Sequence, residues 1–459
     1  MVRPNHAIVI GAGISGLACA YRLKQLGIGV TLLEGQERAG GLIGTVKKDG
    51  FLFESGPQSF QGTDPLLNLI RELGIEGELQ QADPRASRYI LRGGRLQRVP
   101  MSPQGLLASS LLNPKSRWKI ASEPFRRTAP PSKEESVADF VRRKFGHEIL
   151  EYLVAPFVSG VYAGDPEKLS LRAAFPTLEE WERQYGSVVR GAMKSRPAKG
   201  ERKGPPPLYS FRNGLATLMQ ALRQNLGEAL HEGAAVNGIS RTAASDNEYE
   251  VRFTRSSVAE TIPASGVVIA TPAYTASHLV MAMSSSMSQA LSGIAYAPVA
   301  VVAAGYHVQQ IGLPLDGFGF LVPRNEKIRT LGTVWNSSLF PGRAPEGFLT
   351  ITSFIGGATD LEIIEKSESE VATIVGRDNA RILGIEGLPV AQAVWKYPKA
   401  LPQYNLGHGH LIEAARDAER ALPGLFLAGN YLDGPAIGKC VEQGFRTAES
   451  VGAYLKASS

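Results

Sequence analysis

Residues 7–34, AIVIGAGISGLACAYRLKQLGIGVTLLE, decide the fold of this chain of 459 residues. The apolar run Ala7–Ile10 predicts a buried strand, and Leu17–Leu26 has the apolar spacing of a helix that ends at Gly27. A second apolar run, Gly29–Leu33, predicts another strand. Strand, turn, helix and strand in this order form a βαβ unit, so we expect an α/β protein with a Rossmann-like domain.

Three glycines between the first strand and the helix match the pattern GxGxxG. Gly11 permits the tight turn, Gly13 lets the backbone approach a pyrophosphate, and Gly16 lets helix and strand pack closely. The phosphates of a dinucleotide then lie on the N–H groups and the positive dipole end of the helix. Glu34 ends the second strand 18 positions after Gly16, where an acid accepts hydrogen bonds from ribose hydroxyls and disfavours NADP.

Two further glycine turns favour FAD over NAD. Arg38-Ala39-Gly40-Gly41 is typical of FAD enzymes that resemble amine oxidases, and Gly50–Pro57 returns the chain toward the cofactor. Far along the chain, Leu425–Asn430 predicts a buried strand with a second glycine turn. The helix expected from about Ile437 can point its N-terminus at the flavin ring and stabilise negative charge there. The N-terminal and C-terminal glycine turns together predict FAD.

The composition is that of a soluble globular protein of two to four domains, with 43% hydrophobic and 20% charged residues. A net charge of +6 is compatible with anionic partners, but no nucleic-acid module is found. Cys19 and Cys440 fall in predicted helices, so we expect no disulfide framework and a reducing cytoplasm. We expect no signal peptide, and the most apolar run, Ile294–Tyr306, is shorter than the roughly 20 residues of a spanning helix.

The seven histidines are scattered, and His408 and His410 lack an acidic or thiol partner nearby, so no metal site is predicted. Residues 95–204 show helical periods. Residues 194–207, which begin in this segment and run past its end, are rich in Pro, Lys and Arg and are expected to form an exposed loop. Further strands are predicted at Val267–Pro272, Val299–Val302 and Phe348–Phe354.

The chain resembles the oxygen-dependent protoporphyrinogen oxidases, flavoenzymes of haem synthesis within the flavin amine oxidase superfamily. The segments that carry the resemblance are Ile10–Leu17, Glu54–Phe60, Pro156–Pro166, Gly317–Pro323, Leu331–Thr333, Phe354–Gly357 and Leu427–Tyr431. They span nearly the whole chain. The motifs at Gly13 and Glu34 are common to related flavin oxidases, whereas Pro156–Pro166 and Gly317–Pro323 are more specific.

The resemblance implies an FAD-binding domain in three pieces, a strand-rich substrate domain and a helical domain that meets a membrane surface. We place the FAD-binding domain at 1–85, 205–290 and 388–459, the substrate domain at 86–94 and 291–387, and the helical domain at 95–204. Noncovalent FAD is expected, because Cys440 lies after the last glycine turn and not in the loop before it.

The resemblance also implies a reaction in which protoporphyrinogen IX loses six electrons in total, two at a time, to FAD, which molecular oxygen reoxidises with release of hydrogen peroxide. Because the carbon bridges of the substrate are activated by their flanking pyrroles, the protein has only to hold one against flavin N5 and exclude water. No catalytic side chain is therefore expected.

Site residues follow from the resemblance position by position. Arg88 is expected to pair with a propionate, Leu321 and Val334 to sandwich a pyrrole ring, Phe354 to stack on another ring, and the backbone of Ala163 and Gly164 to contact the substrate. The expected cofactor contacts are Gly11, Ala12, Gly13, Ile14, Ser15, Gly16, Glu34, Gly35, Arg38, Gly41, Leu42, Gly56, Pro57, Gln58, Ser59, Val236, Trp395, Gly429, Asn430, Pro435, Ala436 and Ile437.

Several alternatives stay open at this point. The substrate can be coproporphyrinogen III, which differs in two carboxylates, and the protein can instead be a flavin amine or carotenoid oxidoreductase or a porphyrin-binding carrier. A homodimer is compatible with the sequence. We also expect peripheral contact with the inner face of the cell membrane through 102–127. In that segment apolar residues (Leu106, Leu107, Leu111, Leu112, Trp118, Phe125) mix with basic ones (Lys115, Arg117, Lys119, Arg126, Arg127).

Overall fold

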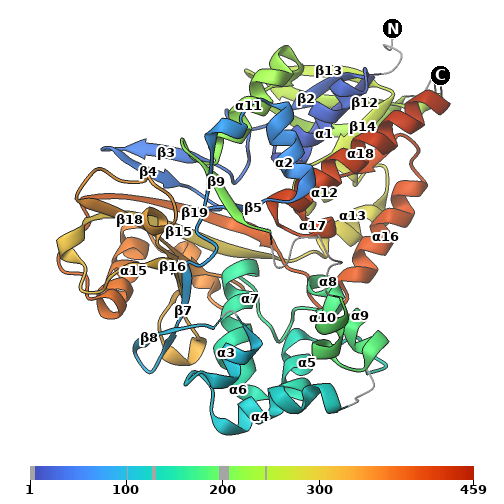
Figure 1. Ribbon diagram of the computed structural model, residues 1–459. Helices are drawn as coiled ribbons and strands as arrows, with labels where there is room; N and C mark the ends of the chain where they lie inside the picture. Colours follow the sequence, from blue (N-terminus) through green and yellow to red (C-terminus); the bar gives the residue numbers. More distant parts are fainter. Residues whose placement is uncertain (1–5, 101, 127–130, 196–205, 243–244, 459) are drawn as a thin grey trace.

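A computed structural model describes residues 6–100, 102–126, 131–195, 206–242 and 245–458. Its first layer is a parallel sheet of five strands in the order β10-β2-β1-β14-β20, which lies at the top of Figure 1 with both chain ends. The strands are β10 (Leu230–His231), β2 (Gly29–Leu33), β1 (His6–Ile10), β14 (Gly266–Ile269) and β20 (Leu425–Leu427). This arrangement confirms the predicted α/β class.

Two helices pack together on one face of this sheet. They are α1 (Ile14–Gln25) and α18 (Ile437–Ala457). A Cβ built at Gly444 of α18 would lie 2.5 Å from the Ser15 carbonyl oxygen of α1, so only glycine permits this approach. α1 begins three residues before the predicted start at Leu17, because the first turn carries glycine and serine and has no apolar periodicity. The final strand is shorter than the predicted Leu425–Asn430, since the chain turns at Gly429.

Smaller sheets and helices complete this half of the molecule. The sheets are β11 (Ala234–Thr242), β12 (Ser245–Arg255) and β13 (Val258–Ala264); β5 (Phe60–Gln61), β9 (Leu208–Phe211) and β6 (Leu79–Gln81); and β3 (Thr45–Lys48) with β4 (Phe51–Glu54). The helices are α2 (Asp64–Glu72), α11 (Ala216–Leu226), α12 (Ala273–Val280), α13 (Ser285–Ser292), α16 (His408–Arg420) and α17 (Asn430–Asp433).

A second large sheet has seven strands in the order β19-β15-β18-β17-β16-β7-β8. They are β19 (Ala391–Pro402), β15 (Tyr296–His307), β18 (Phe348–Gly356), β17 (Thr330–Val334), β16 (Gly317–Leu321), β7 (Ser87–Arg92) and β8 (Arg95–Arg98). β8 and β19 therefore extend the sheet beyond the limits that we predicted at residues 94 and 387. Helix α15 (Glu368–Leu383) covers one face, where Ile382 and Leu383 pack on Tyr306, Phe320 and Ile351. The short helix α14 (Asn336–Leu339) follows β17.

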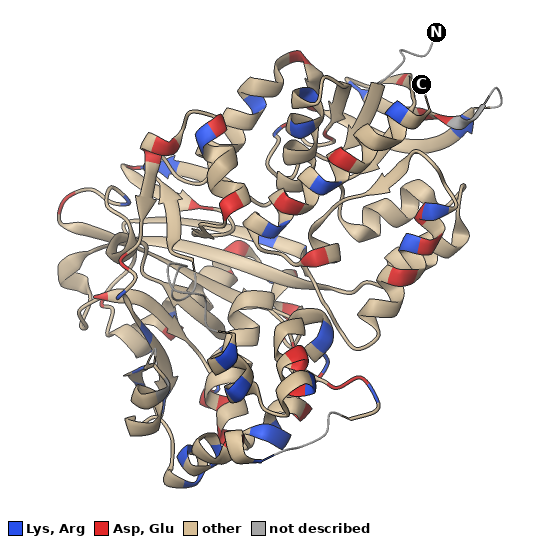
Figure 2. Cartoon of the chain, turned by 45° about the vertical axis from the view of Figure 1, so that its right-hand side comes forward, with Lys and Arg blue, Asp and Glu red and all other residues tan. Residues whose placement is uncertain are grey.

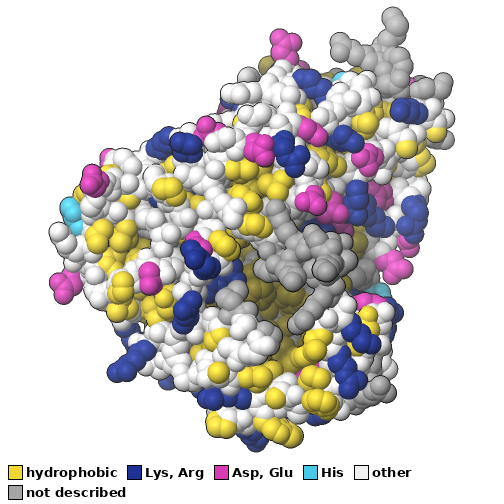
Figure 3. Space-filling model, in the orientation of Figure 1, with side chains coloured by type: hydrophobic (Ala, Val, Ile, Leu, Met, Phe, Trp, Pro, Cys, Tyr) yellow, Lys and Arg dark blue, Asp and Glu magenta, His cyan; other side chains and the backbone are white. Residues whose placement is uncertain are grey.

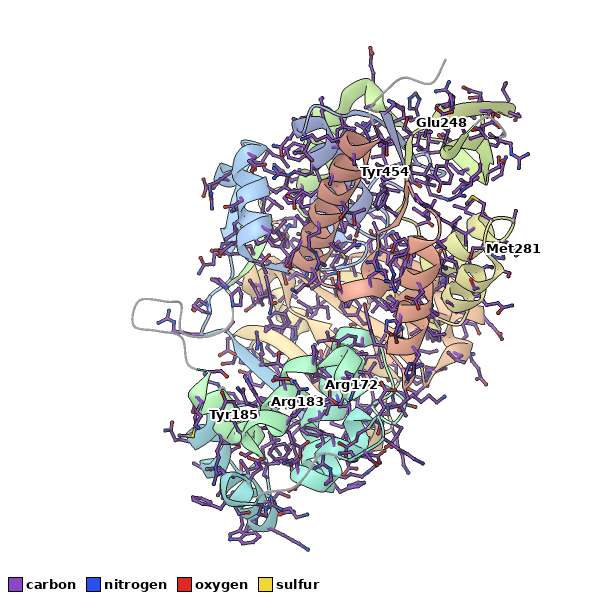
Figure 4. All side chains as sticks on the ribbon, turned by 90° about the vertical axis from the view of Figure 1, so that its right-hand side faces the viewer. Arg172, Arg183, Tyr185, Glu248, Met281 and Tyr454 are labelled. Atoms are coloured by element: carbon purple, nitrogen blue, oxygen red, sulfur yellow. The ribbon has the colours of Figure 1, made fainter. Side chains whose placement is uncertain are left out.

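The helical segment, residues 103–194, lies at the bottom of Figure 1. Its elements are α3 (Pro103–Ala108), α4 (Pro114–Ser122), α5 (Val137–Lys144), α6 (His147–Ile149), the π-helical turn Leu150–Val154, α7 (Ala155–Tyr162), α8 (Leu171–Ala174), α9 (Pro176–Tyr185) and α10 (Val188–Lys194). Figure 4 shows Arg172, Arg183 and Tyr185 in this segment and Tyr454 of α18 near the opposite end of the molecule. Most of the loop predicted at 194–207 lies outside the described residues.

A buried charge network ties α5 and α9 together. Arg143 donates to Glu135 and Glu182, and the Lys144 Nζ lies 2.7 Å from Glu182 Oε1. Lys144 and Glu182 are both almost completely buried, so each charge needs the other and the network fixes how these helices cross. Within the described residues, no helix combines the length and the apolar character needed to cross a membrane.

Candidate functional site

The glycine turn after β1 has the shape that the sequence predicts. Gly11 has a φ of +98°, and a Cβ built at Gly16 would lie 1.9 Å from the Gly11 carbonyl oxygen. Around Gly13, by contrast, a Cβ would meet no atom of the described residues within 4 Å, apart from its chain neighbours and its own helix. Gly13 is also the N-cap of α1, and no side chain caps this helix. The backbone thus presents an open helix N-terminus, which fits a pyrophosphate.

Glu34 lies beside this turn at the end of β2. Its carboxylate accepts hydrogen bonds from the Ala12 N–H at 2.6 Å and the Gln36 N–H at 2.9 Å. Each carboxylate oxygen has a further lone pair, so both can still accept from ribose hydroxyls. A Cβ built at Gly35 would lie 3.5 Å from the Ala235 Cα. Val236 of β11, the next residue, therefore lies close to the end of β2.

Arg38 shapes the second glycine turn. Its guanidinium donates to the carbonyl oxygens of Ala39, Gly41 and Ile43 at 2.8–3.2 Å. A Cβ built at Gly41 would lie 3.4 Å from the Gly13 Cα, so the two glycine turns face each other. Arg38 therefore stabilises the backbone of this second turn, which packs against the glycine loop after β1.

The segment Gly56–Ser59 lies against Leu42. A Cβ built at Gly56 would be 2.2 Å from the Leu42 carbonyl oxygen, which explains the glycine. The side chain of Gln58 is buried, and its amide donates to the Gly56 carbonyl at 2.7 Å and accepts from Asn336 at 2.6 Å. These two hydrogen bonds of the Gln58 side chain thus fix the backbone of this segment.

The C-terminal glycine turn lies between β20 and α18. Gly429 has a φ of +148°, and its N–H donates to Gln443 Oε1 at 3.0 Å. Pro435 and Ala436 lead into α18, whose N-terminus has no side-chain cap. Cys440 is buried in the first turns of this helix, near the Gly434 carbonyl.

Among the described residues, the buried hydroxyls near these turns that have no hydrogen-bond partner include the Oγ1 atoms of Thr63 and Thr271 and the Tyr431 hydroxyl. Thr63 lies 2.5 Å from a Cβ built at Gly438 of α18, and the Thr271 methyl lies 3.1 Å from one built at Gly11. Unpaired buried hydroxyls are rare and indicate a missing partner. Together with the open space at Gly13, they fit a bound dinucleotide between the N- and C-terminal turns.

The expected substrate residues share one face of the seven-stranded sheet. Strand pairing aligns Leu321 with Gly332, Gly332 with Phe354, Phe354 with Val301, and Val301 with Trp395. A second row of paired residues lies two positions along each strand from the first row. It contains Arg88, Gly319, Val334, Thr352, Ala303 and Ala393. Because directly paired residues and residues two apart point to the same side, Arg88, Leu321, Val334, Phe354 and Trp395 project from one face. It is the face opposite to α15.

Helix α7 lies against this face. A Cβ built at Gly160 would be 2.6 Å from Leu321, so α7 packs closely on β16. At its end Ala163 has a φ of +48°, and its carbonyl accepts from the Ala358 N–H at 2.7 Å. The Gly164 carbonyl accepts from Arg324 at 3.1 Å. Ala163 and Gly164, whose backbone is expected to contact the substrate, therefore lie where the helical segment joins the loops that follow β18 and β16.

Two apolar side chains of α7 were absent from our sequence prediction. Phe157 and Val161 are 45% and 44% exposed and lie one helical turn apart on α7, the helix that packs on Leu321 through Gly160. Figure 3 shows apolar side chains gathered around a hollow in the middle of this side of the molecule. The apolar i, i+4 spacing was visible in the sequence, but it does not distinguish a lining residue from a core residue.

Glu54 is a buried carboxyl at the end of β4, just before Gly56. It accepts from Thr45 Oγ1 at 2.6 Å and from the Leu215 N–H at 2.9 Å, and Arg343 lies 3.8 Å away. Burial raises its pKa to about 7, although these hydrogen bonds and Arg343 act in the opposite direction.

This raised pKa predicts a pH-dependent stability. The folded chain holds the Glu54 proton more tightly than the unfolded chain, so the free energy of unfolding should fall as pH rises from 4.5 to about 7. Glu54→Gln should remove this part of the pH dependence of Tm, whereas Glu413→Gln on the surface should not. Parallel Tm–pH curves for Glu54→Gln and the parent protein would show that Glu54 is not the group responsible.

Comparison with known proteins places the chain in a family. The family model of flavin-containing amine oxidoreductases matches residues 14–452. The chloroplastic protoporphyrinogen oxidase of Oryza sativa subsp. japonica is 37% identical over 98% of this chain and 88% of its own length. The coproporphyrinogen III oxidase of Bacillus subtilis (strain 168) is 29% identical over 98% of both chains. A crystal structure from Exiguobacterium sp. 255-15 has a TM-score of 0.83 at 24% identity, covering 99% of this chain and 100% of its own.

These matches cover both glycine turns, the seven-stranded sheet and the helical segment, and they confirm the resemblance on which the site residues were chosen. The chain therefore belongs to the family of flavin-containing amine oxidoreductases, as a relative of the protoporphyrinogen oxidases.

Proposed function

We propose that this protein oxidises protoporphyrinogen IX to protoporphyrin IX, with noncovalent FAD and molecular oxygen. One observation carries the proposal: Arg88 and three apolar side chains, Leu321, Val334 and Phe354, project from the same face of one sheet. A tetrapyrrole offers flat apolar rings and a carboxylate at one edge, and this face matches both. The chloroplastic relatives that act on protoporphyrinogen, by name, support the same substrate.

The chain's own residues have three tasks in this scheme. Gly13 and the α1 N-terminus would hold the pyrophosphate, Glu34 the ribose hydroxyls, and the α18 N-terminus the flavin ring. Bound FAD would supply the redox chemistry, accepting two electrons at a time from the substrate and passing them to oxygen. The sheet face and α7 would orient one carbon bridge toward the ring and exclude water.

The domain assignment goes with this proposal. The five-stranded sheet and the elements around it would form the FAD-binding domain, the seven-stranded sheet with β8 and β19 the substrate domain, and 103–194 the helical domain. Tyr397 of β19 donates to the Ser55 carbonyl at 3.0 Å, so the substrate sheet reaches the cofactor turns directly.

A fluorescence assay with two porphyrinogens tests the substrate. Protoporphyrinogen should yield a fluorescent porphyrin much faster than coproporphyrinogen, since the apolar face would have to accommodate two additional carboxylates. A preference for coproporphyrinogen would assign this chain to the activity named for its Bacillus subtilis relative. No oxidation of either, with turnover of an amine or carotenoid, would favour the wider family; binding without oxidation would indicate a carrier.

We further propose a cytoplasmic protein whose helical segment contacts an anionic membrane surface. Leu111 and Leu112 are buried and belong to the core, which corrects part of the expected apolar surface. Trp118 and Phe125, however, are 66% and 81% exposed. In Figure 2, Lys and Arg positions (blue) recur along the helices at this end of the molecule. Arg127 lies outside the described residues.

Liposome pelleting tests this contact. The double variant Trp118→Ser/Phe125→Ser should bind anionic vesicles at least about tenfold more weakly, because burying an aromatic side chain contributes roughly 1.5–3 kcal/mol. Leu388→Ser is the matched control, since Leu388 is 84% exposed between α15 and β19, away from the helical segment. If the parent protein stays in the supernatant at low salt, the membrane contact is wrong.

A further inference from the structure

Two buried polar side chains contact the backbone just after the C-terminal glycine turn. Tyr404 and His408 are 2% and 4% exposed. The Tyr404 hydroxyl donates to the Asn430 carbonyl oxygen, and the His408 Nε2 lies 3.0 Å from the Tyr431 carbonyl oxygen. The two rings pack edge to face, with centroids 4.8 Å apart. Both side chains therefore act on consecutive peptide groups of the same turn.

These contacts set the orientation of two peptide planes. In a trans peptide the C=O and the following N–H point in opposite directions, so fixing the carbonyl fixes the N–H as well. The hydrogen bonds to Asn430 and Tyr431 thus orient the backbone that leads to Pro435 and the α18 N-terminus. Burial lowers the pKa of His408, which favours a neutral ring that donates from Nε2.

The same short segment is fastened to the helical segment on its other side. The Gly407 N–H donates to Glu134 Oε2 at 2.7 Å, and the Ser170 N–H donates to the Tyr404 carbonyl at 2.8 Å. Ser170 Oγ in turn donates to Glu134 Oε1 at 2.5 Å. In Figure 1 this junction lies between α17 and α8, where β19 leads into α16. The connection from β19 to α16 therefore joins the helical segment to the C-terminal turn.

We propose that Tyr404 and His408 are positioning residues for the flavin ring, which act through the Asn430 and Tyr431 carbonyls and couple the flavin site to the helical segment. The inference rests on the proposed placement of FAD against the C-terminal turn. Neither side chain needs to touch the cofactor, because each acts on the backbone that would carry it. Loss of either hydrogen bond would let the turn rotate and change the environment of the ring.

The test compares two tyrosines that make the same kind of bond. Tyr404→Phe removes one buried hydroxyl that donates to a backbone carbonyl. The matched control, Tyr249→Phe, removes a hydroxyl of the same kind, which donates to the carbonyl of Pro423, just before β20, at 2.7 Å. Both variants should lower Tm to a similar extent. Only Tyr404→Phe should shift the visible spectrum and midpoint potential of the bound flavin and raise the Kd for FAD, by about fivefold for one hydrogen bond.

Two further results decide the inference. His408→Leu should reproduce the shifts of Tyr404→Phe, and Glu134→Ala should give a smaller shift in the same direction, because it acts only through the connection. If Tyr404→Phe and Tyr249→Phe leave spectrum and potential equally unchanged, the positioning role is wrong while the FAD site stands. If the parent protein takes up no flavin at all, the proposed cofactor fails, and the inference fails with it.

Discussion

Replacing Gly13 by alanine should remove most of the bound FAD and leave the apoprotein folded. In the part of the chain that the structure describes, a Cβ at this position meets no neighbouring atom within 4 Å, so we expect no clash in the apoprotein. The same open space is where the pyrophosphate would reach the N–H groups of α1. Loss of two charge-assisted hydrogen bonds of roughly 1.5–3 kcal/mol each corresponds to an increase of roughly 100-fold or more in Kd.

Titration of the apoprotein with FAD, followed by flavin fluorescence, measures this change. Gly376→Ala in α15 is the matched control, because a Cβ there also meets nothing within 4 Å but lies far from the glycine turns in the chain. Gly16→Ala should behave differently from both: its Cβ would lie 1.9 Å from the Gly11 carbonyl oxygen, so the apoprotein itself should lose stability. Unchanged FAD affinity in Gly13→Ala would mean that the phosphates bind elsewhere.

Arg88→Ala should lower kcat/KM for protoporphyrinogen by about 10- to 100-fold. Arg88 is exposed on β7, beside Gly319, and its guanidinium lies 5.4 Å above the Phe318 ring. From there the planar fork can meet a propionate with two charge-assisted hydrogen bonds. One hydrogen bond to a charged group contributes roughly 1.5–3 kcal/mol, and each 1.36 kcal/mol is a factor of about ten in rate.

The control for Arg88 is on the neighbouring strand. Arg98 of β8 pairs with Tyr89 and therefore projects from the opposite face of the sheet, so Arg98→Ala should leave kcat/KM unchanged. Arg88→Lys should recover only part of the activity, since lysine keeps the charge and loses the fork. Flavin content and Tm should stay close to those of the parent. An Arg88→Ala protein with full kcat/KM would show that the propionate is held by another group.

The sequence is sufficient to predict the βαβ unit, because local periodicity and the glycine pattern determine it. The order β10-β2-β1-β14-β20 could not be predicted, since β14 joins β1 across more than 250 residues of intervening chain and β20 joins β14 across more than 150. For the same reason, the sheet to which β19 belongs could not be predicted. Residues 391–402 carry no local sign of which sheet they join, and only their pairing with β15 places Trp395 on the same face as Phe354, with β15 between the two strands.

The site residues divide in the same way, into those that a local motif predicts and those that only long-range contacts bring together. Gly11, Gly13 and Glu34 form a local motif, and their spacing alone predicts a dinucleotide. Arg88, Leu321, Val334 and Phe354 were chosen by resemblance, because no local pattern shows that four strands bring them to one face. Tyr404 and His408 could not be found in this way: their role depends on hydrogen bonds to a turn more than 20 residues away along the chain.

The stoichiometry of oxygen use tests the central claim most directly. Protein reconstituted with FAD and given protoporphyrinogen should consume about three molecules of oxygen and release about three of hydrogen peroxide for each protoporphyrin formed, because six electrons leave in pairs. Oxygen uptake, peroxide and protoporphyrin fluorescence, recorded in one anaerobic-to-aerobic experiment, give both ratios. No porphyrin should accumulate before oxygen enters, because one bound flavin accepts only two of the six electrons. Porphyrin formation at the same rate without FAD, or none with FAD and oxygen present, would contradict the account.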